Sequence, residues 1–157
     1  MEPSKSQRKY EELQRSCARI EDLYKGLIIN NEGQDTLQSP KDILLNFFRV
    51  CYELKEALKR DPTLPIEFKD GVEKFWKTNR YAALSLDVAN QEKHITLGSN
   101  NKSGHRIGKI NTQIHSLSPD GKPDHTRVTI EIDGVAQDGL DLAKKVLLAW
   151  KELYEKI

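Results

Sequence analysis

Residues 71–97 read GVEKFWKTNRYAALSLDVANQEKHITL, and their apolar side chains predict one long helix. With each residue turned about 100° from the last, these side chains fall on two opposite faces of the helix. One face holds Val72, Phe75, Trp76, Ala82, Ala83, Leu86 and Leu97, and the other holds Tyr81, Leu84, Val88 and Ile95. A helix that is apolar on two sides packs against neighbours on both of them. We therefore predict that a helix over about 68–97 is central and is enclosed by the rest of the chain.

Two amphipathic helices are predicted before this one, and one after it. The first covers about 4–29, with a narrow apolar seam formed by Tyr10, Leu13, Cys17, Ile20, Tyr24 and Leu27. The second covers 40–60, because Ser39 is a good N-cap, Pro40 suits the first helical position and Asp61-Pro62 ends the pattern. The last covers about 140–156 and has a wide apolar stripe.

Between the central and last helices, the hydrophobic period changes from helical spacing to two. Apolar or β-branched residues alternate with polar ones at Ile110, Thr112 and Ile114 and again at Val128, Ile130 and Ile132. The turn-rich segment 118–124 separates the two runs, which predicts a β-hairpin over about 106–133. Asp133-Gly134 can turn the chain into a third short strand. The predicted fold is a single mainly α domain, 1–157: a four-helix bundle with a hairpin of two or three strands inserted before the last helix.

Composition limits the function classes. The chain has 157 residues, 31% of them charged, and a formal net charge of +1, so no global field attracts nucleic acid or an acidic membrane. No run of about 18 apolar residues and no leader segment is evident. Cys17 and Cys51 occupy apolar positions and are expected to be buried free thiols. We expect a cytoplasmic protein without a membrane segment.

A polar cluster lies at the end of the predicted central helix. Asp87, Asn90, Lys93 and His94 are spaced by three or four residues, so they share one side of a helix. In the favoured interpretation they fasten the helix to the hairpin through hydrogen bonds. In the functional one, Asp87, Asn90 and His94 are catalytic candidates: Asp87 orients His94, and Asn90 contacts a phosphate during acid–base attack on RNA.

Residues 93–119 form a basic segment without a single acidic residue. Lys93, Lys102, Arg106 and Lys109, together with Arg80 upstream, are candidates for binding an anion or RNA. Acidic residues follow in the second half of the hairpin and beyond, at Glu131, Asp133, Asp138 and Asp141. Antiparallel pairing would bring Arg106 and Lys109 close to these carboxylates. Internal neutralisation is therefore favoured over ligand binding.

The sequence predicts neither a metal nor a cofactor. His105, His115 and His125 are spaced by ten, but zinc would need further ligands such as Asp120 or Asp124. The two cysteines form no CxxC pair, and no Walker or dinucleotide spacing occurs.

Two resemblances follow from these motifs. The pattern from Asp87 to His94, followed by a hairpin with Ile132-Asp133-Gly134 and by Asp141-Leu142-Ala143 leading to Trp150, resembles a group of small uncharacterised bacterial helical proteins. The bundle also resembles the HEPN class of four-helix domains, which implies RNA cleavage or nucleotide handling in toxin–antitoxin and phage-defence systems. That class places a His four to six residues after an Arg, and no His of this chain has an Arg at that distance.

Two functions are consistent with the sequence. The favoured one is a non-catalytic interaction module of a bacterial defence or toxin–antitoxin system, which binds a protein partner or a second copy of itself through a hairpin edge or a helix face. The alternative is a HEPN-like RNA- or nucleotide-handling protein, in which a metal-independent ribonuclease would use the cluster from Asp87 to His94. The absence of a catalytic motif favours the first.

Overall fold

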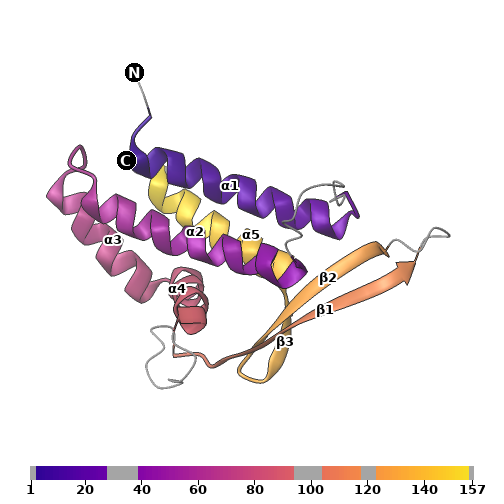
Figure 1. Cartoon of the computed structure of the whole chain (residues 1–157). Helices are drawn as coiled ribbons and strands as arrows, with labels where there is room; N and C mark the ends of the chain where they lie inside the picture. The colour runs from indigo at the N-terminus through magenta and orange to yellow at the C-terminus, as the bar shows by residue number, and fades with distance from the viewer. Residues whose placement is uncertain (1–2, 28–38, 94–103, 118–122, 156–157) are drawn as a thin grey trace.

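The computed structural model describes residues 3–27, 39–93, 104–117 and 123–155, without the side chains of 92–93, 114–117 and 123–125. The elements are α1 (Lys5–Tyr24), α2 (Pro40–Arg60), α3 (Ile66–Thr78), α4 (Arg80–Lys93), β1 (Ile107–Leu117), β2 (Pro123–Ile132), β3 (Val135–Asp138) and α5 (Gly139–Tyr154). A mainly helical fold with an antiparallel sheet before the last helix is confirmed (Figure 1). None of the described helices is long and apolar enough to cross a lipid bilayer.

The predicted continuous helix over 68–97 is wrong, because the helix breaks at Asn79. This residue is extended, with ψ 123°, and its backbone N–H still bonds to the carbonyl oxygen of Phe75 at the end of α3. Its side-chain Oδ1 accepts hydrogen bonds from the backbone N–H groups of Tyr81 at 3.0 Å and Ala82 at 3.1 Å. Asn79 thus caps α4, an arrangement that competes with helix continuation because the Asn side chain replaces backbone acceptors.

Of the predicted long helix, only the α4 part is enclosed. Every residue from Ala82 to Ala89 is buried, whereas α3 buries only Val72 and Trp76 among its residues. α4 packs against α2, α3, α5 and β1, which together cover its buried stretch. The predicted continuation through 94–97 lies outside the described residues.

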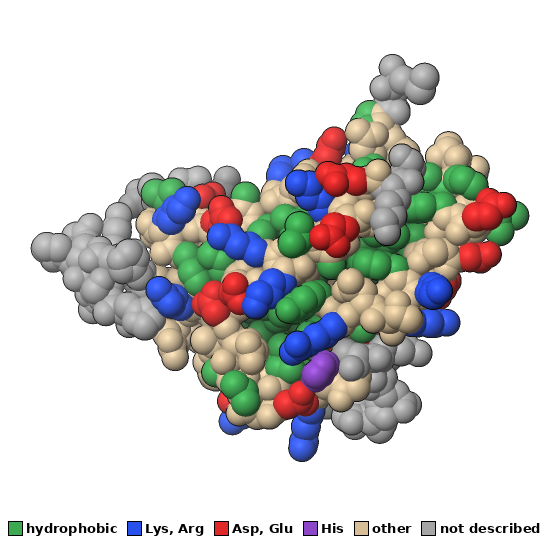
Figure 2. Space-filling model, turned by 180° about the vertical axis from the view of Figure 1, so that it is seen from behind, with side chains coloured by type: hydrophobic (Ala, Val, Ile, Leu, Met, Phe, Trp, Pro, Cys, Tyr) green, Lys and Arg blue, Asp and Glu red, His purple; other side chains and the backbone are tan. Residues whose placement is uncertain are grey.

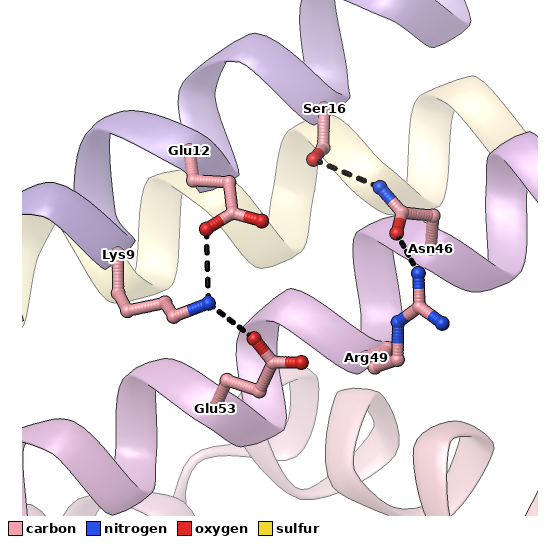
Figure 3. Close-up of polar contacts among 6 residues, drawn as sticks. All are labelled: Lys9, Glu12, Ser16, Asn46, Arg49 and Glu53. Carbon is pink, nitrogen blue, oxygen red and sulfur yellow. Dashed lines mark hydrogen bonds and ion pairs between the residues drawn. The ribbon is translucent and has the colours of Figure 1, made fainter.

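α1 and α2 pack side by side through an apolar seam with a polar rim (Figure 3). On the rim, the Lys9 ammonium bridges Glu12 and Glu53, and the Asn46 amide donates to the Ser16 hydroxyl at 3.4 Å. Exposed pairs of this kind stabilise a fold by less than about 1 kcal/mol each. The buried apolar side chains beneath the rim therefore hold the two helices together.

The sheet has the strand order β1-β2-β3, and all neighbours are antiparallel. Val128, Ile130 and Ile132 of β2 are buried against the helices. Asp133 and Gly134 form the tight turn into β3 with φ 54° and 79°, as the Asp-Gly pair predicts. The far end of the β1–β2 hairpin projects beyond the helices (Figure 1).

The Tyr24 hydroxyl joins α1 to the sheet and to α5. It accepts hydrogen bonds from the backbone N–H groups of Val128 and Leu140, each at 3.2 Å. Its proton faces the Asp138 carboxylate at 2.7 Å and the Val128 carbonyl oxygen at 2.9 Å. β3 ends at Asp138, which pairs with Thr129. The Tyr24 hydroxyl therefore forms the hydrogen bonds with the Val128 backbone that the next residue of a longer β3 would have formed. Burial raises the pKa of Tyr24 to about 12, which keeps the phenol neutral.

Candidate functional site

The predicted polar cluster is described only in part. Asp87 is 2% exposed and lies within the buried stretch of α4, while Asn90 is half-buried one turn further on. His94 and the side chain of Lys93 lie outside the described residues. A buried carboxylate is not presented to a substrate, so the position of Asp87 favours the fastening interpretation over the catalytic one.

The basic candidates are spread over different elements. Arg80 is exposed at the start of α4, Arg106 precedes β1 and Lys109 lies on β1, whereas Lys102 is outside the described residues. Antiparallel pairing does bring carboxylates to the hairpin base, but the backbone amides receive them. The Arg106 N–H donates to Asp133 at 2.8 Å and the Lys109 N–H to Glu131 at 3.5 Å. In the described part of the chain, no ion pair engages the Arg106 or Lys109 side chain.

His105, which the sequence analysis considered as a metal ligand, contacts Asp133. Its Nδ1 lies 2.6 Å from Asp133 Oδ2, and the Arg106 N–H together with this imidazole holds the pKa of Asp133 below its ordinary value. The side chains of His115 and His125 are outside the described set, within which no group of three or more potential metal ligands occurs. Asp133 therefore closes the base of the hairpin and fixes where the chain enters β1.

The contacts of Tyr24 also show which backbone groups of β1 point away from β2. Because the Val128 N–H and C=O are taken by Tyr24 on the β3 side, they do not bond to Thr112, the residue paired with Val128 on β1. Paired residues in an antiparallel ladder alternate between bonded and non-bonded pairs. The N–H and C=O of Thr112, and by the same alternation those of Ile110, therefore point away from β2. No described strand lies on that side of β1.

A groove of about 420 Å³ runs along this edge of β1. Its lining consists of Lys41 and Leu45 from α2, Val88 and Gln91 from α4, and the successive β1 residues 107–111. Leu45, Val88 and Ile107 are buried and form an apolar wall. Of the residues that line the groove, two are basic, Lys41 and Lys109, and none is acidic. The groove thus combines backbone groups that no described strand pairs with, an apolar wall and two lysines. We name it the edge groove.

A second hollow, of about 640 Å³, lies between the start of α1 and the end of α2. Four of its charged side chains contact one another: Lys9 pairs with Glu53, and Arg60 with Glu56. Asp61, at 7% exposed, accepts hydrogen bonds from the hydroxyls of Ser6 and Thr63. These contacts satisfy the groups internally, so this hollow is a weaker candidate than the edge groove.

Three further buried side chains are structural. Lys55 lies under the Trp76 ring at 4.2 Å from the ring centroid, and its burial lowers the pKa of the ammonium. Cys17 and Cys51 are free and buried, as predicted. Burial raises the pKa of Cys17 to about 11 and that of Cys51 further, so neither supplies a thiolate at neutral pH.

Comparison of the chain with models of protein families, with curated proteins and with solved structures found no match. The resemblances to small bacterial helical proteins and to the HEPN class therefore stay predictions.

Proposed function

We propose that this protein is a non-catalytic interaction module that binds an extended segment of a partner protein along the free edge of β1. The observation that supports this is the outward direction of the Ile110 and Thr112 backbone groups beside the edge groove. An added strand gains main-chain hydrogen bonds from such an edge, and a neighbouring groove receives its side chains. The predicted setting in a bacterial defence or toxin–antitoxin system is part of the same proposal.

A catalytic role receives less support. The Asp87 carboxylate is buried, and both cysteines are protonated in the core. Figure 2 shows Lys and Arg side chains interspersed with Asp and Glu on the face seen from behind, so the described residues of this face form no broad positive patch of the kind that binds RNA. The HEPN-like alternative therefore rests on the predicted bundle resemblance and on His94, which is outside the described residues.

A different chain is a better occupant of the edge than a second copy. Residues 107–117 contain Lys109 and no acidic residue, so pairing β1 with β1 would bring only basic charge together. Gly108 and Lys109 both face Glu131, which makes a β-bulge near the start of the edge. Bulges and edge lysines are devices that oppose indiscriminate strand pairing. The edge is thus suited to a selected partner.

Substitution of Thr112 tests this proposal. Thr112→Pro removes the outward N–H without removing a hydrogen bond to β2, and Thr112→Val keeps the N–H and is the matched control. Peptides selected from a displayed random library against the wild-type chain should bind Thr112→Val normally and Thr112→Pro at least about tenfold more weakly, with both variants melting close to wild type. Equal binding to the two variants, or a library that yields no binder, would overturn the proposal.

A further inference from the structure

We infer that the edge groove selects a partner segment in which an apolar residue is flanked by acidic residues. This inference rests on the proposed function, because it requires strand pairing at β1. It adds the chemistry of the partner, which the free backbone groups alone leave undefined. The lining of the edge groove provides two separate recognition elements.

The apolar element is the wall between β1 and the helices. Leu45, Val88 and Ile107 are almost fully covered, and Ile110 is half-buried with one side open to the groove. A strand laid along β1 points every second side chain to the face of the sheet that carries Ile110. The partner residue opposite Ile110 therefore enters the groove beside Leu45, where an apolar side chain is favoured.

The charged element is the pair of lysines. Lys109 neighbours Ile110 in sequence, so it lies on the opposite face of the sheet and meets the residues that flank the apolar one in the partner strand. Lys41 lines the same groove from the first turn of α2. In the described part of the chain, neither ammonium takes part in an ion pair.

Two acidic residues lie near these lysines, and neither of them is among the residues that line the groove. Glu131 contacts the Lys109 backbone N–H at 3.5 Å and lies over Gly108, where an added Cβ would meet its Oε2 at 2.8 Å. Asp42 follows Lys41 in sequence, but its backbone N–H is bonded to the Ser39 cap and its side chain does not line the groove. The acidic residues that flank the apolar one in a partner strand therefore meet Lys109, while Lys41 adds positive charge on the helix side of the groove, and positively charged segments are disfavoured.

Synthetic ten-residue peptides with fluorescent labels provide the probes. One carries a Glu-Ile-Glu centre between alternating Thr and Val residues, the second replaces both Glu residues by Lys, and the third replaces the central Ile by Ser. Fluorescence anisotropy with the full chain should show that the acidic–apolar peptide binds at least about tenfold more tightly than the Lys peptide and about fivefold more tightly than the Ser peptide. Higher salt should reduce the first preference and leave the second.

Charge reversal gives the sharper test. Lys109→Glu should weaken binding of the acidic peptide about tenfold and strengthen that of the Lys peptide, whereas Lys74→Glu, an exposed lysine on α3 outside the groove, should change neither. Unchanged preference in Lys109→Glu would overturn the inference, and loss of binding in Thr112→Pro would show that strand pairing at the edge still holds. If the peptides bind equally well to the wild-type chain and to Thr112→Pro, both the inference and the proposed function are contradicted.

Discussion

The side chain of Gln91 donates a hydrogen bond of 3.0 Å to the carbonyl oxygen of Ile107. Ile107 is the first residue of β1, and its carbonyl points away from β2 towards α4. At Ile107 the Gln91 side-chain amide donates the hydrogen bond that a backbone N–H of a further strand would otherwise donate. The open edge of β1 therefore begins after Ile107, where α4 contacts the strand. No described residue donates such a side-chain hydrogen bond to the backbone of Ile110 or Thr112.

Removal of this amide should cost stability. We expect Gln91→Ala to lower the free energy of unfolding by about 0.5–1.5 kcal/mol, because the Ile107 carbonyl loses its partner. Urea denaturation followed by circular dichroism measures the change. Gln113→Ala, on the exposed part of β1, is the control and should change stability by less than about 0.5 kcal/mol. Equal effects in the two variants would show that the Gln91 contact is incidental.

Tyr24→Phe should be more harmful, because one hydroxyl serves two backbone N–H groups and the Asp138 carboxylate. A loss of about 1–3 kcal/mol in the free energy of unfolding is expected, because these part-buried groups lose their partner. Tyr154→Phe keeps the ring that stacks on Tyr10 and loses a hydroxyl outside this network, so it is the control. The prediction fails if both variants unfold at the same urea concentration.

Substitution of Asn79 distinguishes a capped α4 from a continuous helix, because the two arrangements predict stability changes of opposite sign. As the cap of α4, its replacement in Asn79→Ala should destabilise the chain by about 0.5–2 kcal/mol, and Asn79→Asp, which can still cap, should retain most of the stability. If the helix were continuous, Ala would instead stabilise it, since Ala is the best helix former. Thermal unfolding of the two variants distinguishes these outcomes.

The pH dependence of stability should depend partly on Asp61. Hydrogen bonds from Thr63 and Ser6 hold the pKa of this carboxyl below its ordinary value. A carboxyl with a depressed folded-state pKa stabilises the fold above its unfolded pKa, near 4, and this contribution is lost as pH falls through the lower folded value. Asp61→Asn should therefore be less stable than wild type at pH 7, and the gap should narrow at about pH 3. A gap that is constant with pH would mean that ionisation of Asp61 makes no contribution.

Most elements could be predicted because their signals are local. Ser39-Pro40 gives the start of α2, and Asp133-Gly134 gives the turn between β2 and β3. The break at Asn79 was missed because apolar periodicity continues across it, and the choice between capping and helix continuation depends on packing that periodicity does not report. The burial of Cys17 and Cys51 followed from their apolar positions.

The edge groove could be predicted only in part. A free hairpin edge followed from the strand pattern, and Lys109 was among the predicted ligand-binding residues. The wall of the groove could not be foreseen, because Lys41, Val88 and residues 107–111 come together only through the packing of α2 and α4 against β1. The bulge at Gly108 and Lys109, which sets the direction of residues 110–114 of β1, also lacks a sequence signal of its own.

Hydrogen exchange of the β1 amides tests most directly whether a partner strand pairs with the outer edge of β1. In the free protein, the Thr112 amide should exchange rapidly while the amides of Asn111 and Gln113, which point towards β2, are protected. Addition of the acidic–apolar peptide should slow exchange at Thr112 and leave its two neighbours unchanged. A Thr112 amide that is already protected in the free protein, or that exchanges equally fast with the peptide bound, would contradict strand pairing at this edge.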